Sequence, residues 1–158
     1  MIVRHETIYQ KALLIDRFIE FYMKAKKRKR FPRKEAGQVI KLLFPNSRNV
    51  GEGAFKKVFQ ISSRSRDLAL KVSGEENIRN DVGAYDRLPK NIRNRCFAKI
   101  YWNTKYCLLQ KYGKAVRVPP EVIGSLKKKV KPYGLSDVRV ANIRKVDGKF
   151  KIVDANTR

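Results

Sequence analysis

Apolar positions along this 158-residue chain follow a helical spacing first and a strand-like spacing later. Residues 6 to 26 repeat apolar side chains every three or four positions, which predicts an amphipathic helix. The stripe consists of Ile8, Ala12, Ile15, Ile19 and Tyr22, widened by Leu14, Phe18 and Phe21. A second helix is predicted over 33 to 44, bounded by Pro32 and by Pro45-Asn46-Ser47. We expect both helices to pack on the rest of the domain, with a partner-binding helix as the alternative.

From Val50 onward, short apolar runs and turn signals predict strands. Two runs, 58 to 61 and 68 to 72, flank the polar stretch 62 to 67, which suits a hairpin turn. Helical spacing returns over 75 to 88 and over 119 to 131. Further hairpins are predicted for 97 to 110, with its turn at 103 to 105, and for the strands near 143 to 146 and 150 to 153. Asp147-Gly148 is a strong turn signal between the last two strands. The chain is therefore expected to have an α+β fold.

The net charge of +24 changes the picture of the surface. Such an excess of positive charge repels itself in the compact state and attracts polyanions. The densest basic block runs from 24 to 34 and is interrupted only by Ala25, Phe31 and Pro32. Blocks of this kind bind nucleic acid, act as targeting signals, or are solvated helix ends. Nucleic acid, a ribonucleoprotein or an acidic protein is therefore a candidate partner. The sequence carries no signal for the oligomeric state.

Cysteine and histidine usage limits the chemistry. If Trp102 pairs with Tyr106 in the predicted hairpin, Cys107 lies opposite Tyr101 and away from Cys96, so no disulfide is expected. This favours an intracellular, reducing compartment: the cytoplasm, or the nucleus in a eukaryote. Two cysteines and one histidine cannot form an ordinary zinc site. The sequence shows no signal-peptide pattern and no apolar run approaching the ~18 residues of a membrane span, so no membrane association is expected.

Candidate chemistry lies in five short segments that occur in a definite order. Gly51 and Gly53 come first, and glycines let backbone N–H groups approach phosphate oxygens. Lys71 follows on an apolar run, where an ammonium group needs an anion nearby. Asp137, Asn142 and Asp154 come later, and their side chains are of the types that bind Mg²⁺. A nucleoside triphosphate site needs these components, so ATP binding or phosphoryl transfer is the first hypothesis.

In these segments the chain resembles the protein-kinase-like superfamily, closest to its RIO and aminoglycoside-phosphotransferase-like branches, over about residues 50 to 156. The resemblance implies an antiparallel-sheet N-lobe and a much reduced C-lobe, preceded by a helical extension. The corresponding divisions are 1–48 for the extension with its basic run, 49–113 for the N-lobe and hinge, and 114–158 for the minimal C-lobe. Most of the helical half of a kinase C-lobe, where peptide substrates dock, has no counterpart here.

The resemblance also implies the nucleotide-binding residues. The glycine-rich pattern is matched by Gly51, Gly53 and Val58, with Phe55 as the loop-tip aromatic and Lys56 in place of the third glycine. Lys71 matches the strand lysine that holds the α- and β-phosphates, and Asp81 matches its acidic partner, with Glu75 and Glu76 as competing candidates. Backbone groups near Lys111 and Gly113 would hold the adenine edge.

Its implied catalytic residues lie in the C-terminal third. Asp137 would accept the proton of the attacking hydroxyl, and Asn142, five residues on, would bind Mg²⁺. Asp154 would be the second metal ligand, although Ala155-Asn156 replaces the usual Phe-Gly. Leu135 stands where the family usually has histidine.

Three functions remain open at this point. The first is a Mg²⁺- and ATP-dependent phosphotransferase, with a serine/threonine protein kinase as one form. The second is a catalytically weak or inactive pseudokinase that serves as a binding module for nucleic acid, the ribosome or an acidic protein. The third is an unrelated α+β nucleic-acid-binding protein, in which Lys71 and Asp154 would lie far apart.

Overall fold

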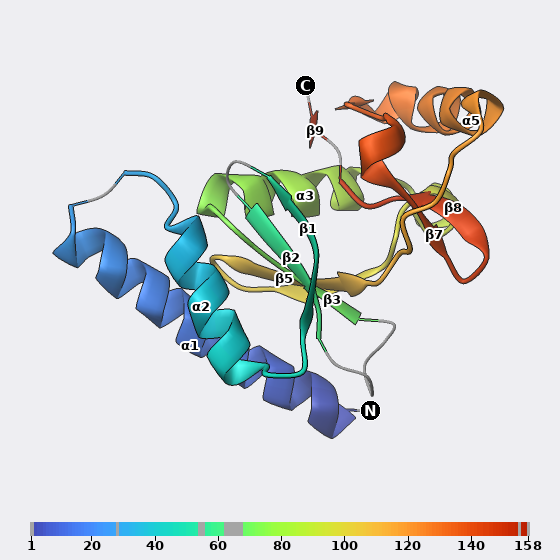
Figure 1. The fold of residues 1–158 in the computed structure, drawn as a ribbon. Coiled ribbons are helices and arrows are strands. Elements are labelled where there is room, and N and C mark those ends of the chain that lie inside the picture. The colour runs from blue at the N-terminus through green and yellow to red at the C-terminus, as the bar shows by residue number, and fades with distance from the viewer. Residues whose placement is uncertain (1, 28, 54–55, 62–67, 155, 158) are drawn as a thin grey trace. The chain divides into compact units, whose positions relative to one another are not determined.

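The structure is a computed structural model that describes residues 2–27, 29–53, 56–61, 68–154 and 156–157. The chain forms two compact units. The first comprises Met1–Ile78 with Trp102–Leu109, and the second Arg79–Tyr101 with Gln110–Arg158. Figure 1 gives the order of the helices and strands along the chain.

A five-stranded sheet holds most of the first unit together. Its strands, in the order of the sheet, are β1 (Arg48–Gly53), β2 (Lys56–Gln60), β3 (Leu68–Ser73), β5 (Cys107–Lys111) and β4 (Ile100–Asn103). β1 pairs with β2, and β2 with β3, in antiparallel fashion. The predicted strands at 58 to 61 and 68 to 72 are therefore present, whereas the predicted turn at 62 to 67 lies outside the described residues.

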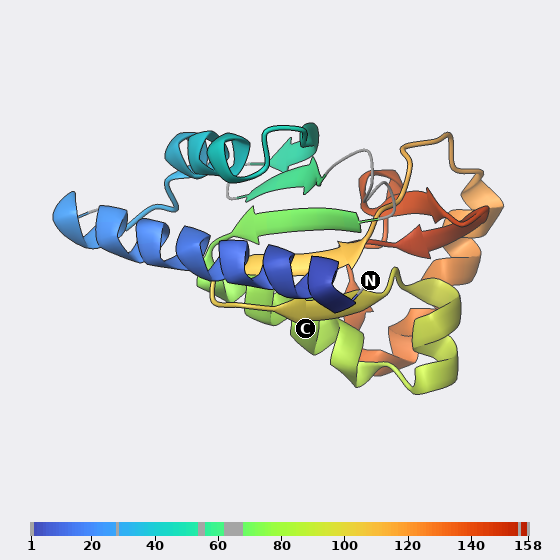
Figure 2. The same ribbon diagram turned by 90° about the horizontal axis from the view of Figure 1, so that it is seen from below.

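Two helices cover one face of this sheet, as Figures 1 and 2 show. Helix α1 (Ile2–Ala25) and helix α2 (Arg33–Leu43) fall where the sequence predicts them. The buried side chains of α1 are Ile8, Ala12, Ile15 and Ile19, which confirms the central stripe. Leu14 and Phe21, however, are 50% and 74% exposed. Their predicted role in widening the stripe is wrong, because the sheet contacts a narrower arc of the helix than the apolar residues occupy.

The carboxylate of Asp16 on α1 fixes the turn between β4 and β5. Asp16 Oδ1 accepts hydrogen bonds from Thr104 Oγ1 and from the Tyr106 backbone N–H, both at 3.0 Å. Asp16 Oδ2 accepts the Lys105 N–H at 3.1 Å. The next turn of α1 adds Glu20, which accepts a hydrogen bond from the Tyr106 hydroxyl at 2.7 Å and pairs with the Lys105 ammonium. Helix α1 is thus bonded to a hairpin more than 80 residues away.

These bonds also correct the predicted hairpin register. The Thr104 N–H donates to the Cys107 carbonyl, so the turn lies later than predicted. The Tyr106 N–H is taken by Asp16, and the Tyr106 carbonyl accepts the Ser73 N–H of β3, which leaves no place for the predicted Trp102–Tyr106 pair. Both cysteines are nevertheless free and buried, so the expected absence of a disulfide is confirmed.

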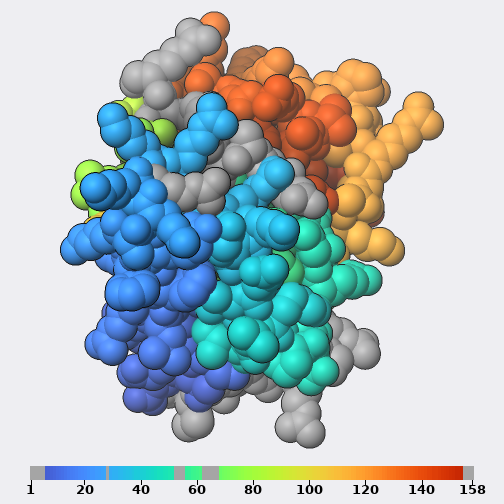
Figure 3. All heavy atoms as spheres, turned by 60° about the vertical axis from the view of Figure 1, so that its left-hand side comes forward, coloured from blue at the N-terminus to red at the C-terminus, as the bar shows by residue number. Residues whose placement is uncertain are grey.

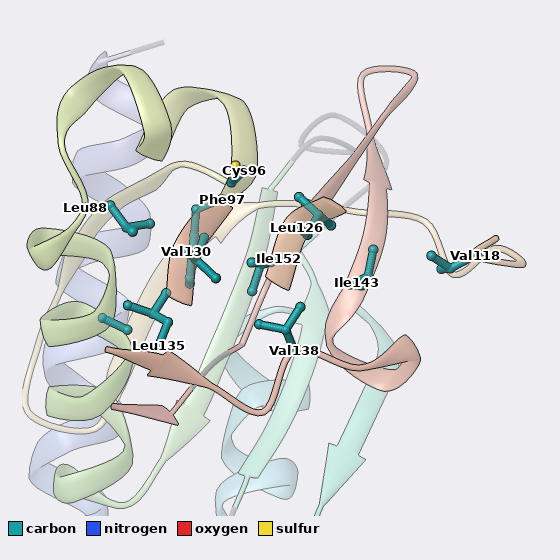
Figure 4. Close-up of a cluster of buried hydrophobic side chains, with 11 residues drawn as sticks. Leu88, Cys96, Phe97, Val118, Leu126, Val130, Leu135, Val138, Ile143 and Ile152 are labelled. Atoms are coloured by element: carbon teal, nitrogen blue, oxygen red, sulfur yellow. The ribbon is translucent and has the colours of Figure 1, made fainter. Parts of the chain in front are cut away.

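The second unit has its own hydrophobic core, shown in Figure 4. Its helices are α3 (Glu75–Arg87), which begins in the first unit, α4 (Lys90–Cys96), α5 (Pro120–Val130) and the short 3₁₀ turns η2 (Lys131–Tyr133) and η3 (Val140–Asn142). Its strands are β6 (Leu135–Ser136), β7 (Ile143–Val146), β8 (Lys149–Ile152) and β9 (Asn156–Thr157). The core is formed by apolar side chains from these helices and strands, including Phe97, Val130 and Ile152.

The predicted helices at 75 to 88 and 119 to 131 and the last hairpin are all present within one or two residues. Helix α4 was not predicted. The side chain of Arg93 on α4 donates to the backbone carbonyls of Tyr85, Asp86 and Leu88. It therefore caps the C-terminal end of α3 and connects that end to α4. Its guanidinium also lies 4.6 Å from the centre of the Tyr85 ring, within the range of a cation–π contact.

The fold is therefore α+β, with an antiparallel five-stranded sheet, as the sequence predicts at this level. In the described part of the chain, none of the helices combines the length and apolar character needed to cross a bilayer.

Candidate phosphate and metal site

The predicted phosphate-binding residues of the first unit share one face of the sheet. Directly paired residues of antiparallel strands project to the same side, and neighbours along a strand alternate. Gly51 pairs with Val58, and Val58 pairs with Lys71, so these three form one row across β1, β2 and β3. The next row on the same face consists of Gly53, Lys56 and Ser73.

The opposite face of these strands is the one that α2 covers. The side chain of Lys57 lies against Gly37 of α2, so close that a Cβ at Gly37 would meet Lys57 Cδ at 3.1 Å. Because Lys57 alternates with Lys56 and Val58, the row of Gly51, Val58 and Lys71 faces away from α2. The structure thus gathers five predicted cofactor residues, Gly51, Gly53, Lys56, Val58 and Lys71, on one face. Phe55 lies outside the described residues.

Lys71 is 4% exposed, and its neighbours along β3, Leu70 and Val72, are buried on the other face of the sheet. A buried ammonium group is retained only with counter-charge or hydrogen bonds. Among the three acids considered as its partner, Asp81 on α3 is 5% exposed, whereas Glu75 is half-buried and Glu76 is exposed.

The predicted hinge follows β5. The Lys111 N–H donates to the Lys99 carbonyl at 2.8 Å, and the Thr104 N–H donates to the Cys107 carbonyl. The backbone N–H and carbonyl groups of the odd-numbered residues of β5 therefore point toward the β4 side. The Tyr106 carbonyl accepts from Ser73, so even-numbered residues face the β3 side. The backbone N–H of Lys111 is therefore used within the sheet. By the same alternation, the backbone groups of Gln110 and Tyr112 point away from β4.

Gly113 has a packing role. A Cβ at this position would lie 2.4 Å from Arg144 Cβ and 3.0 Å from Val146 Cγ2 on β7. The next residue, Lys114, exchanges two backbone hydrogen bonds of 2.9 Å with Lys145. The absence of a side chain at Gly113 lets the segment after β5 lie directly against β7.

Asp137 and Asn142 form a compact loop in the second unit. Asn142 Nδ2 donates to the Asp137 carbonyl at 2.8 Å and to Asp137 Oδ2 at 3.2 Å. The other carboxylate oxygen, Oδ1, pairs with Arg139 Nε at 3.0 Å. Asp137 has φ +63°, a left-handed conformation that aspartate adopts more readily than most residues. Both oxygens of the Asp137 carboxylate are thus held in place by neighbouring side chains.

Two backbone connections bring the Asp154 segment to this loop. The Val153 N–H donates to the Asn142 carbonyl at 2.9 Å. On the other side, β6 pairs with β9, and Ser136, the residue before Asp137, pairs with Asn156. Asp154 lies between these two connections. The predicted triplet of Asp137, Asn142 and Asp154 is therefore gathered within one unit.

Leu135 and Arg139 lie two residues before and two residues after Asp137 and have different roles in this loop. Leu135, at the family's histidine position, is buried in the core of the second unit (Figure 4). A histidine would hold this position by polar contacts, whereas Leu135 is held by apolar packing and by the β6–β9 pairs. Arg139 was not singled out from the sequence, although its place two residues after Asp137 was a usable signal.

The oxygen donors of Asn142 and Asp154 suit Mg²⁺ better than a metal ion whose ligands are all protein side chains. Mg²⁺ usually binds one or two carboxylates and completes its shell with water and substrate phosphates. Asn142 and Asp154 carry oxygen donors of the kind that such a partial set uses. The described residues contain no group of three or more His, Cys, Asp or Glu side chains that could hold a metal ion.

Cysteine nucleophiles are not part of this chemistry. Burial raises the pKa of the Cys96 thiol and raises that of Cys107 further, where Asp16 adds to the effect. Both groups are therefore neutral thiols near pH 7 and poor nucleophiles.

A cavity of about 560 Å³ opens beside Asp137 in the second unit. Its lining combines lysines from α5 and η2 with the residues that precede and follow Asp137: Lys127, Lys131, Leu135, Ser136, Asp137 and Val138. The carboxylate predicted to accept a proton thus borders a space of the size that substrates occupy.

Comparison with known proteins gives no independent assignment. The chain matches no family model, and no curated protein is significantly similar to it.

Proposed function

We propose that this protein is a Mg²⁺-dependent phosphotransferase that uses ATP, with a reduced protein-kinase-like fold. The observation that carries the proposal is the grouping of Asp137, Asn142 and Asp154 by the Val153–Asn142 hydrogen bond and the β6–β9 pairs. These residues, which lie between positions 137 and 154, have the types that phosphoryl transfer requires and share one loop cluster.

The first unit supplies the proposed phosphate-binding surface. Gly51 has no side chain to keep a phosphate away from the backbone of β1. Lys71, on the same face, provides the positive charge for phosphate oxygens. Asp81 is the proposed counter-ion that orients Lys71. For the adenine edge we assign backbone groups of the segment 111 to 113 other than the Lys111 N–H, which bonds to the Lys99 carbonyl within the sheet.

The proposed reaction transfers the γ-phosphoryl group to a hydroxyl. Asp137 accepts the proton of that hydroxyl, whose oxygen bonds to the γ-phosphorus while the bond to the β–γ bridging oxygen breaks and ADP leaves. Asn142 and Asp154 would hold Mg²⁺, which would offset the negative charge on the phosphates. Arg139 and Asn142 keep the Asp137 carboxylate oriented before the acceptor binds.

Transfer of ³²P from γ-labelled ATP tests the proposal directly. The wild type should label itself or a mixed acceptor such as casein in the presence of Mg²⁺. Asp137→Asn and Asp154→Asn should each lower the rate at least 100-fold without loss of the circular dichroism spectrum, since asparagine tolerates the left-handed φ of Asp137. Asp86→Asn, at an exposed position of α3, is the matched control and should retain full activity. Equal rates for all four proteins, or no transfer by the wild type, would reject a phosphotransferase.

The exposed basic segment supports a second function, binding of nucleic acid. Lys24, Lys26, Lys27, Lys29, Arg30, Arg33 and Lys34 are all exposed. They lie where α1 leads into α2, on the surface that Figure 3 presents in blue and cyan. An array of positive charge with few acids nearby binds phosphate backbones by releasing counterions.

This second function predicts a steep dependence on salt. Binding of a fluorescent single-stranded RNA should weaken as salt rises, and replacing Lys26, Lys27, Lys29 and Arg30 by glutamine should reduce the slope of log K against log salt by about three. Four exposed lysines elsewhere, Lys90, Lys128, Lys129 and Lys149, provide a control with the same net charge. If both variants lose the same affinity, the segment has no specific role. ATP binding without transfer, together with RNA binding, would identify a pseudokinase.

A further inference from the structure

The lysines at the cavity beside Asp137 identify a property of the acceptor. Lys127 of α5 and Lys131, the residue that caps the C-terminus of α5, are both exposed and both border the cavity, whereas Lys128 and Lys129 between them do not. Residues four apart lie on the same face of a helix, and Lys131 keeps helical angles, with φ −53° and ψ −44°. Two positive charges therefore point to the same side as the cavity.

This arrangement costs stability in the free protein. Like charges four residues apart on a helix repel each other. Their position at the C-terminal end of α5 offsets part of that repulsion through the helix dipole, but this benefit applies equally to Lys128 and Lys129. The dipole does not explain why two of these lysines border the cavity that contains Asp137. An anionic ligand in the cavity does.

We propose that the phosphoacceptor is an acidic peptide segment whose serine or threonine hydroxyl reaches Asp137 while its carboxylates contact Lys127 and Lys131. The inference rests on the proposed phosphotransferase function and names its substrate class. The step is the transfer described above: the hydroxyl proton goes to Asp137, the hydroxyl oxygen gains the phosphoryl group, and ADP leaves.

Spacing and lining favour a peptide. Cβ atoms four residues apart on a helix are about 5–6 Å apart. Alternate residues of an extended peptide project to the same side about 6.6 Å apart, so two acids at alternate positions match two such lysines. The lining of the cavity includes the buried residues Leu135 and Val138. Among the described residues that line it there is no aromatic ring on which a nucleic-acid base would stack, which argues against an RNA acceptor.

The experiment compares two peptides and three proteins. One peptide has a central serine flanked by glutamates at alternate positions, and the other has lysines in place of the glutamates. The proteins are the wild type, Lys127→Ala/Lys131→Ala, and the control Lys128→Ala/Lys129→Ala. Both variants lose the same net charge from the C-terminal end of α5 and its cap residue, and alanine preserves helix propensity.

For the wild type we expect transfer to the acidic peptide at a KM at least tenfold lower than for the basic one. The Lys127/Lys131 variant should raise the KM for the acidic peptide about fivefold, in keeping with the loss of two exposed ion pairs, and leave kcat within about twofold. The control should change KM by less than about twofold. Lys127→Glu/Lys131→Glu should reverse the preference toward the basic peptide.

The failure of this inference is distinguishable from the failure of the phosphotransferase function. If the wild type transfers phosphate but does not prefer the acidic peptide, or if both alanine variants raise KM equally, the acceptor site is wrongly assigned and the phosphotransferase stands. Transfer to a short RNA, or to an anionic small molecule such as a sugar phosphate, with no transfer to either peptide, would also overturn it. If no acceptor is phosphorylated and MgATP does not bind, the proposed function itself has failed.

Discussion

Asn142 Nδ2 donates to two oxygens of Asp137, the backbone carbonyl at 2.8 Å and carboxylate Oδ2 at 3.2 Å. One side chain thus fixes both the left-handed backbone and the carboxylate orientation of the residue assigned to proton transfer. Because the Asn142 carbonyl also accepts the Val153 N–H, the same residue connects the loop to the Asp154 segment. We expect its substitution to affect stability and transfer together.

Asn142→Asp tests this arrangement without changing side-chain size. Aspartate has no donor for Asp137 and places a second negative charge beside its carboxylate. We expect the free energy of unfolding at pH 7 to fall by about 2 kcal/mol, as for a lost buried donor, and transfer to fall at least 100-fold. Urea denaturation and the ³²P assay measure the two effects. Asn91→Asp, exposed on α4, should change neither; an Asn142→Asp protein as stable as this control would contradict the arrangement.

Gly113→Ala should destabilise the chain through packing. The added methyl group would lie 2.4 Å from Arg144 Cβ, so the hinge segment must move away from β7. We expect a loss of about 1–3 kcal/mol, the usual cost of overpacking, measured by denaturation. The matched control is Gly124→Ala on α5, where a Cβ meets no atom within 4 Å. That change should stabilise the protein by about 0.5–1 kcal/mol, as expected for alanine in a helix. A neutral Gly113→Ala would show that this close approach is absent in solution.

A double-mutant cycle tests the partner of Lys71. Lys71→Met and Asp81→Leu each leave one buried charge, so each should cost about 3 kcal/mol or more, whereas the double variant should cost far less than the sum. The cycle between Lys71 and Glu76, which is exposed, should give a coupling energy near zero. A larger coupling with Glu76 than with Asp81 would show that the acid was wrongly assigned.

The acids on α1 predict two opposite dependences on pH. Burial raises the pKa of Asp16 above its ordinary 3.8, despite the hydrogen bonds from Thr104, Tyr106 and Lys105. Its contribution to stability is therefore largest below about pH 3.8 and is lost as pH rises through the folded-state pKa. Hydrogen bonds from Lys105 and Tyr106 lower the pKa of Glu20 below 4.5, so its contribution is present above that pH and lost as pH falls.

Urea denaturation of Asp16→Asn and Glu20→Gln between pH 3 and pH 7 measures both effects. The stability of the wild type relative to Asp16→Asn should decrease as pH rises through this range. Its stability relative to Glu20→Gln should increase. Slopes of the same sign for the two variants would contradict the assignment of either carboxylate.

The sequence predicted the helices and turns whose formation depends on interactions between residues close together in the chain. The 3.6-residue stripe through Ile8, Ala12 and Ile15 gave α1, since burial of one helix face requires that spacing. Asp147-Gly148 gave the β7–β8 turn, and both residues have positive φ, at +50° and +79°, as such turns require. The order of Asp137, Asn142 and Asp154 predicted that these residues act together, and the second unit does bring them together.

The features that were missed depend on contacts between distant segments. The β4–β5 register is set by Asp16, about 90 residues earlier in the chain, so the hairpin sequence alone could not reveal it. Strands β6 and β9 have two residues each, too few for any period to be detected. The lysines at the cavity were indistinguishable in the sequence from the other lysines of α5, because only the fold determines which of them border Asp137.

Calorimetric titration of the full chain with ATP, with and without Mg²⁺, tests the central claim most directly. We predict that wild type binds MgATP with a Kd in the micromolar range and ATP alone at least tenfold more weakly. Asp154→Asn should lose the effect of Mg²⁺, and Asp86→Asn should retain it. Failure of the wild type to bind MgATP, or an Asp154→Asn protein that binds MgATP as tightly as the wild type, would contradict the claim that Asp154 and Asn142 hold the metal of a nucleotide site.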